Sequence, residues 1–259
     1  MGEWDSRQYL LFKNERTQPA IDLVNRLNIV SPRKIIDIGC GPGNSSQVLA
    51  RKFPKAYILG IDKSPDMIET ARRCYPDINF QVGDISRDLA TIGDDIDIIF
   101  SNACLQWVPN HRQLLPGLFK LLKPGGALAV QIPMNQQEPI HKIIAEVSTS
   151  EKWKLAFTGQ RRFFNLTPSE YFAVLSEISA EFSMWETIYY HKLKSPADIM
   201  EWYRGSGLRP YLRALAAEKR GAFEQDILAR VKESYPAQKN GEIIFRFPRF
   251  FFICGSKRS

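Results

Sequence analysis

The sequence contains no run of about 18 apolar residues, so it predicts no membrane-spanning helix. It has four cysteines among 259 residues, scattered along the chain without a C-x-x-C pair. This scatter predicts reduced thiols and no metal site. The opening residues lack an apolar signal segment, which predicts a cytoplasmic protein.

A dense run of lysine and arginine is also missing, although the net charge is +7 and the isoelectric point is near 9.2. The basic residues are spread along the chain with acidic residues among them. This charge is compatible with a solvated basic surface, with nucleic acid binding or with an acidic small substrate. The spread favours the small acid over nucleic acid. The length predicts one large domain, or one domain with a lid.

What the chain does contain is a strand, a glycine turn and a helix in close succession. An apolar, β-branched segment predicts a buried strand with Asp37 near its end. Three glycines then occupy every second position: Gly39, Gly41 and Gly43. From Asn44 the pattern becomes helical. Glycines let the backbone pass close to a ligand, and the helix N-terminus beyond them favours a negative group. A plain tight turn after a core strand is the alternative.

The spacing of these glycines distinguishes between ligands. A dinucleotide-binding fingerprint, G-x-G-x-x-G, would place its last glycine at position 44, which is asparagine here. The pattern D-x-G-x-G-x-G resembles the first motif of the class I S-adenosylmethionine-dependent methyltransferases. The resemblance implies that Asp37 holds the ammonium group of the methionine moiety, directly or through water.

Two further acids each close a predicted strand. Asp62 ends the strand 57–62 about 20 residues after the glycine turn, where a carboxylate can accept hydrogen bonds from both ribose hydroxyls. Asp84 closes the strand 78–85. The resemblance implies that Asp84 meets the adenine amino group and that the N–H of Ile85 meets a ring nitrogen. Because the carboxyl ends of these strands share one edge of the sheet, the acids predict a single site.

Other cofactor candidates lie on either side of these strands. Met67 follows an N-cap serine and a proline, and it either lies on the adenine face or belongs to the core. Tyr9 shares a predicted helix face with Phe12 and Arg16, and it either reaches the site or packs against the core. The expected cofactor contacts are Tyr9, Asp37, Gly39, Gly41, Gly43, Asn44, Asp62, Lys63, Met67, Asp84, Ile85 and Asn102.

The order of these elements predicts an α/β fold with a Rossmann-like, doubly wound sheet of seven strands. The fourth and fifth strands are expected at 96–102 and 127–133. Segments 182–193 and 242–254 also read as strands, and the resemblance implies that they pair antiparallel at the sheet edge. Between them, residues 194–241 are helical in pattern and are expected to form a substrate lid.

This organisation divides the chain into three parts. Residues 1–30 are expected to form two helices over the cofactor site, the second beginning near Pro19. Residues 31–135 form the S-adenosylmethionine-binding core. Residues 136–259 complete the sheet and carry the lid.

Along nearly its whole length the chain resembles the trans-aconitate 2-methyltransferase family. Many methyltransferases share the glycine motif. The Gly-Leu-Arg-Pro segment at 207–210 and the Tyr-Tyr-His segment at 189–191 are more specific, because they lie in the variable substrate part. The Asn-Ala-x-Leu-Gln-Trp segment at 102–107 matches as well. Residues 134–165 depart from the family pattern, and this region could alter the choice of acid.

The resemblance implies transfer of a methyl group from S-adenosylmethionine to one carboxylate of trans-aconitate, which gives a monomethyl ester and S-adenosylhomocysteine. A carboxylate has a pKa near 4 and is already ionised at neutral pH, so no acid or base residue is required. The other carboxylates need cationic clamps, for which arginine is suited. The candidate clamps and walls are Arg16, Tyr190, His191, Trp202, Arg209 and Arg249.

Two other classes of function stay open at this stage. One is a methyltransferase acting on another small acid, a carrier-bound acyl group or a phenol. The other is a non-catalytic module that binds the cofactor or RNA. No Asp/Asn-Pro-Pro-Tyr/Phe motif follows the fourth strand, which disfavours nucleobase and amide nitrogens as acceptors. No membrane partner is expected, and a monomer is favoured.

Overall fold

The computed structural model describes residues 12–157 and 163–256, except for the side chains of Lys13 and Ala90. The cofactor candidate Tyr9 lies outside the described residues. Within the described part of the chain, no helix has the length and apolar character needed to span a membrane.

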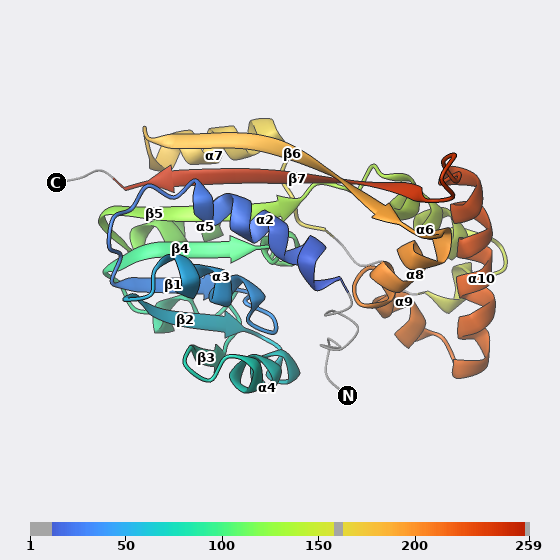
Figure 1. Ribbon diagram of the computed structural model, residues 1–259, viewed down its shortest axis with the longest axis horizontal. Helices are drawn as coiled ribbons and strands as arrows, with labels where there is room; N and C mark the ends of the chain where they lie inside the picture. Colours follow the sequence, from blue (N-terminus) through green and yellow to red (C-terminus); the bar gives the residue numbers. More distant parts are fainter. Residues whose placement is uncertain (1–11, 158–162, 257–259) are drawn as a thin grey trace.

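The strands of the described residues form one seven-stranded sheet in the order β3-β2-β1-β4-β5-β7-β6 (Figure 1). Strands β1 to β5 are parallel, whereas β7 is antiparallel to both β5 and β6. The expected doubly wound sheet with an antiparallel last pair is therefore confirmed. The strand bounds are β1 Lys34–Ile38, β2 Tyr57–Asp62, β3 Asn79–Val82, β4 Ile96–Asn102, β5 Leu122–Pro133, β6 Phe182–Leu193 and β7 Ile243–Gly255.

Helices cover both faces of the sheet because successive strand residues point to opposite sides. In β1, Ile35 packs in a cluster with Leu23 and Leu49, on one face. Its neighbour Ile36 packs with Leu115 on the other face. The α-helix bounds are α2 Lys13–Asn25, α3 Asn44–Lys52, α4 Pro65–Cys74, α5 His111–Lys120, α6 Pro139–Thr149, α7 Pro168–Ile178, α8 Pro196–Arg204, α9 Arg209–Ala214 and α10 Ala217–Ser234. Short 3-10 turns are η1 Leu89–Thr91, η2 Leu105–Trp107 and η3 Lys154–Ala156.

The expectation that Pro19 begins a helix is wrong, because Pro19 lies inside α2. A proline within a helix removes one backbone hydrogen bond. Burial explains why the helix nevertheless continues, since Ala20, Leu23 and Val24 are each at most 1% exposed. Tertiary packing of an apolar face outweighs local propensity here.

The last two strands extend beyond the rest of the sheet. β5 pairs with β7 only as far as Arg249, and the segment of β7 before it pairs with β6 alone. In Figure 1, α6, α8, α9 and α10 gather around this extension, on the side to which the arrowheads of β4 and β5 point. These helices share an apolar core that includes Tyr203, Phe223, Ile227 and Phe245. The insert expected to be helical is confirmed as α8, α9 and α10.

Two strand boundaries differ from expectation. β3 ends at Val82, so Asp84 lies in the turn that follows rather than in the strand. β5 begins at Leu122, before its two glycines, and its register with β4 shifts between Ile96 and Ile98. A bulge of this kind lets a strand continue through residues that otherwise read as a turn.

Candidate functional site

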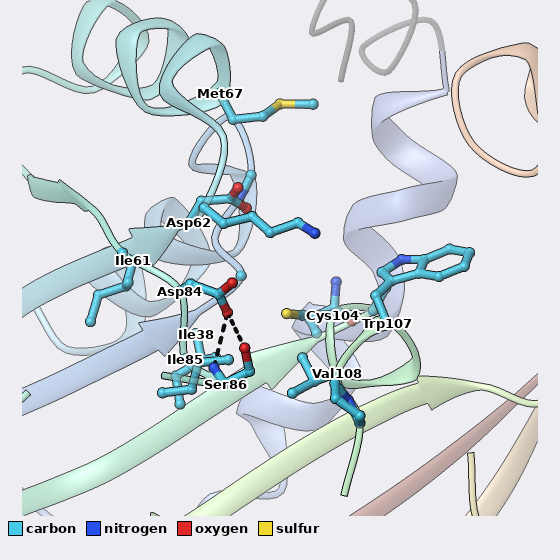
Figure 2. A pocket seen from close by; sticks show the side chains of 17 residues that line it. Ile38, Ile61, Asp62, Met67, Asp84, Ile85, Ser86, Cys104, Trp107 and Val108 are labelled. Atoms are coloured by element: carbon cyan, nitrogen blue, oxygen red, sulfur yellow. Dashed lines mark hydrogen bonds between the residues drawn. The ribbon is translucent and has the colours of Figure 1, made fainter. Parts of the chain in front are cut away.

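A cavity of about 270 Å³ lies at the carboxyl ends of β1, β2, β3 and β4. We call it the glycine-turn cavity. Figure 2 shows Asp62 and Asp84 on one side of this cavity, and Cys104 and Trp107 on the other. The residues expected to bind the cofactor that line it are Gly39, Gly41, Asp62, Lys63, Met67, Asp84, Ile85 and Asn102.

The glycine turn leaves open space where a ligand needs it. Gly41 has a φ of +54°, and a Cβ added there would meet nothing within 4 Å. Gly39 has a φ of +69°, and its added Cβ would lie 2.2 Å from the side chain of Cys104. Only glycine fits both positions without strain. The turn is fixed by the N–H of Gly41, which donates to Oδ2 of Asp62 at 3.0 Å.

The carboxylates of Asp62 and Asp84 in this cavity are held by hydrogen bonds from neighbouring residues. Oδ1 of Asp62 accepts a hydrogen bond from the N–H of Ser64 at 2.9 Å. Oδ1 of Asp84 accepts from both the hydroxyl and the N–H of Ser86, drawn as dashed lines in Figure 2. The Ser86 hydroxyl bond lowers the pKa of Asp84. Both groups can therefore present acceptor oxygens to a ribose or an adenine amino group.

Asp37 lies near the carboxyl end of β1, in the interior of the protein. It is fully buried and does not line the cavity. Its Oδ2 accepts hydrogen bonds from the hydroxyls of Ser45 at 2.7 Å and Ser46 at 2.6 Å. Burial raises the pKa of Asp37 to about 6, against the lowering effect of both serines. In this structure Asp37 fastens the start of α3 beneath the glycine turn. Its expected role at the ammonium group of the methionine moiety, directly or through water, stays a prediction.

Gly43 and Asn44 also lie away from the main cavity. An added Cβ on Gly43 would lie 2.7 Å from the ring of Tyr75, so this glycine is needed for packing. Asn44 accepts a hydrogen bond from the Tyr75 hydroxyl at 3.3 Å. It lines a small hollow together with Arg16, on the other side of the turn.

A second cavity, of about 80 Å³, adjoins the first. Ala103 and Trp107 line both, so the two cavities meet at the turn after β4. Among the expected substrate residues, Arg16, Trp202 and Arg249 line it, and we call it the arginine cavity. Its other lining residues are Gln106, Pro133, Asn135, His141, Phe163, Tyr203, Ser206, Gly207 and Phe247.

The two arginines of this cavity are deeply buried. Arg16 is 8% exposed and Arg249 is 3% exposed. Nη2 of Arg16 donates to the backbone oxygen of Trp202 at 3.1 Å, and Nη1 of Arg249 donates to Oε1 of Gln131 at 3.2 Å. These hydrogen-bond acceptors are neutral. A planar guanidinium binds a carboxylate through two parallel hydrogen bonds, so two such groups in the lining of one cavity favour an anionic ligand.

Three of the expected substrate residues do not line either cavity. Tyr190 is 63% exposed on the edge strand β6, because its neighbours Tyr189 and His191 point inward. His191 packs behind the wall, with its ring 5.0 Å from that of Trp202, and burial together with Arg249 lowers its pKa to about 4. Arg209 begins α9, beside the lining residue Gly207 but outside the lining.

Several lining residues were not expected from the sequence. Gln106 and Trp107 belong to the family-like segment after β4, which was a usable signal. Asn135, His141 and Phe163 come from the region that departs from the family pattern. They share no local motif. Asn135 follows the end of β5, His141 lies on α6, which packs against α10, and Phe163 packs against Trp107. The described residues contain no group of three or more His, Cys, Asp or Glu able to hold a metal ion.

Comparison with known proteins agrees with this geometry. Residues 29–196 match a family model described as a methyltransferase domain. A trans-aconitate 2-methyltransferase of Rhodopseudomonas palustris is 40% identical over 98% of this chain and 99% of its own length. The YcgJ protein of Bacillus subtilis has a similar fold, with a TM-score of 0.61, 16% identity and coverage of 93% of this chain and 99% of that one.

A further solved structure with a similar fold contains the cofactor product S-adenosylhomocysteine. The phosphoethanolamine N-methyltransferase 2 of Haemonchus contortus, solved with S-adenosylhomocysteine, has a TM-score of 0.58 at 14% identity. The alignment covers 98% of this chain and 57% of that one. S-adenosylmethionine is the cofactor that the glycine-turn cavity fits, because its acids and open glycine turn suit a nucleoside. The chain belongs to the trans-aconitate 2-methyltransferase family of S-adenosylmethionine-dependent methyltransferases.

Proposed function

We propose that this enzyme methylates one carboxylate of trans-aconitate and forms its monomethyl ester. The observation that carries the proposal is the pair of buried guanidinium groups, Arg16 and Arg249, in a cavity that adjoins the glycine-turn cavity. S-adenosylmethionine supplies the methyl group as a sulfonium when bound. The name of the relatives that match the chain along its whole length supports the choice of acid.

We assign the two arginines to the carboxylates that do not react. A planar guanidinium binds a carboxylate through two parallel hydrogen bonds, which fixes its orientation. The reacting carboxylate would then lie near Ala103 and Trp107, where the two cavities meet. Holding the reacting atoms in line can supply on the order of 7–11 kcal/mol of the barrier.

The proposed reaction uses no general base. The acceptor oxygen is already ionised at neutral pH, since carboxylic acids of this kind have a pKa of about 4. The residues of the chain therefore bind the acid, orient its reacting carboxylate and exclude water. The apolar and aromatic lining supports this role, with Trp107, Trp202 and Phe247 around the guanidinium groups.

We also propose a separate role for each of the three parts of the chain. Residues 1–30 cover the cofactor, residues 31–135 bind it, and the rest completes the sheet, with the insert at 194–241 closing over the substrate. We further propose that the enzyme acts as a cytoplasmic monomer on a free small acid, not on nucleic acid. The modest size of the arginine cavity supports a small acceptor.

A panel assay tests this proposal. The purified protein would be incubated with S-adenosylmethionine and trans-aconitate, other di- and tricarboxylic acids, a phenol, an acyl thioester or RNA. The proposal expects methyl transfer to trans-aconitate above all others. Transfer to a phenol or to RNA instead would contradict it.

A further inference from the structure

The arginine cavity has a second, uncharged wall. Asn135 follows β5, His141 lies on α6 and Tyr203 lies on α8, and all three line the cavity. The Tyr203 hydroxyl lies 2.9 Å from Nε2 of His141 and 3.2 Å from Nδ2 of Asn135. Asn135 is 4% exposed and Tyr203 is 3% exposed, so this network has little access to solvent.

The network determines where the imidazole carries its hydrogen. The amide of Asn135 is placed with Nδ2 facing the Tyr203 hydroxyl, and in this orientation the Tyr203 oxygen accepts a hydrogen bond from it. The single hydroxyl hydrogen of Tyr203 is then free to be donated to Nε2 of His141. In the opposite arrangement, with Nε2 donating, that hydrogen would have no acceptor among the described residues. The neutral ring therefore carries its hydrogen on Nδ1.

The surroundings of His141 keep the ring neutral and oriented. Its ring lies edge-on to those of Phe163, at 5.3 Å, and Tyr203, at 5.2 Å. Burial lowers the pKa of His141 to about 4. The ring borders the arginine cavity and also a hollow lined by Ile144 and Tyr211. No described residue makes a hydrogen bond to its Nδ1, which leaves this donor to a ligand.

On the basis of the proposed function, we propose that His141 is a further substrate-binding residue, whose Nδ1–H donates to a carboxylate of the acceptor acid. Asn135 and Tyr203 are positioning residues that hold the ring in the donating tautomer. A neutral donor suits this wall because Arg16 and Arg249 already place two buried positive charges in the cavity. A third cation would add a desolvation cost, whereas an N–H adds a directed hydrogen bond.

Two substitutions of His141 separate the two ring nitrogens. His141→Asn places an amide nitrogen close to the position of Nδ1, and His141→Gln places one close to that of Nε2. The His141→Gln variant should lose the donor to the substrate. Its kcat/KM should fall by about 10-fold to 100-fold, as for the loss of one hydrogen bond to a charged group. The His141→Asn variant should recover most of this loss, although it breaks the bond to Tyr203.

The readouts distinguish binding from folding. Calorimetric affinity for S-adenosylhomocysteine shows whether each variant is folded, and it should not separate the two variants. The Tm of His141→Asn should be the lower of the two, because this variant breaks the bond to Tyr203. A purely structural role predicts the reverse ranking, with His141→Gln the milder change because it can still reach Tyr203. Equal kcat/KM in the two variants, or that reverse ranking, would overturn the proposal.

The panel assay on the wild-type enzyme separates failure of this inference from failure of the proposed function. If it methylates a different acid of the panel, only the choice of trans-aconitate is contradicted, and the two variants are compared on that acid. If it methylates no carboxylic acid, the proposed function and this inference both fall.

Discussion

Arg16 on α2 and Arg249 on β7 line the same cavity, although they lie near opposite ends of the described chain. The Arg16 guanidinium lies 5.2 Å from the ring centre of Trp202, and that of Arg249 lies 4.3 Å from the ring centre of Phe247. These two aromatic rings are themselves 5.6 Å apart. One aromatic cluster thus holds both cations, and the fold brings the two ends of the described chain together at this cavity.

The substitution Arg249→Lys should weaken substrate use without affecting the cofactor. An ammonium group cannot reproduce the planar fork of a guanidinium. We expect kcat/KM for trans-aconitate to fall by roughly 10-fold to 150-fold, as for the loss of about 1.5–3 kcal/mol. Steady-state kinetics measure this, and calorimetry with S-adenosylhomocysteine should give an unchanged affinity.

The matched control is Arg230→Lys. Arg230 lies on α10, forms an exposed ion pair with Glu146 and lines neither cavity. Exposed pairs contribute about 0–1 kcal/mol, so its kinetics should stay near those of the wild type. An equal effect of the two substitutions would show that Arg249 is not a clamp.

The substitution Gly41→Val should abolish cofactor binding. A branched side chain would project into the glycine-turn cavity, at a φ of +54° that β-branched residues rarely adopt. Calorimetry with S-adenosylhomocysteine should detect no binding.

Gly221→Ala is the control for Gly41→Val. Gly221 lies within α10, and an added Cβ would meet nothing within 4 Å. Replacing a helical glycine by alanine stabilises a protein by about 0.5–1 kcal/mol. This variant should bind normally and unfold at a slightly higher temperature. Normal binding by Gly41→Val would show that the cofactor does not bind at this turn.

Asp37 should make stability fall as pH rises. Its folded pKa is about 6, above the ordinary value of 3.8, so the folded state holds the proton more tightly than the unfolded chain. Protonation therefore favours folding, and this advantage is lost as pH rises from about 4 to 6. Two pKa units correspond to about 3 kcal/mol at most.

The measurement is the unfolding free energy of wild type and Asp37→Asn from pH 4 to 7. The asparagine cannot titrate, so the wild type should lose about 1–3 kcal/mol relative to the variant across this range. Using the difference removes the contribution of the other carboxylates. A difference that is constant with pH would mean that Asp37 has an ordinary pKa.

The rate at saturating substrate should vary little between about pH 6 and 8. The acceptor carboxylate is ionised throughout this range, since its pKa is about 4. His141, which lines the arginine cavity, has a pKa near 4 and stays neutral. A kcat profile governed by one group titrating near pH 7 would contradict the absence of a general base.

Local patterns were sufficient to predict most of the residues that line the glycine-turn cavity from the first three strands. The glycine spacing and the strand-end positions of Asp62 and Asp84 depend on a few neighbouring residues, and parallel strands bring their ends together. The expected contact of Asp37 with the methionine ammonium, directly or through water, stays a prediction, and the sequence does not show which groups compete for its oxygens. Ser45 and Ser46 occupy one of them from the following helix.

The substrate half depends on contacts between distant segments. His141 and Tyr203 meet only because α6 and α8 pack around the extension of β6 and β7. Arg209 and Tyr190 carried specific family-like motifs, yet neither lines a cavity: Arg209 begins α9, and Tyr190 lies on the exposed face of β6. Side-chain direction in such inserts is set by tertiary packing and not by the local pattern.

The central claim is that a carboxylate of trans-aconitate accepts the methyl group. The most direct measurement is mass spectrometry and NMR of the product formed by the purified enzyme from trans-aconitate and S-adenosylmethionine. The account predicts a single monomethyl ester and one equivalent of S-adenosylhomocysteine, with a rate that falls in the Arg249→Lys variant. Unchanged trans-aconitate, under conditions in which the same enzyme methylates a phenol, a thioester-bound acyl group or RNA, would contradict it.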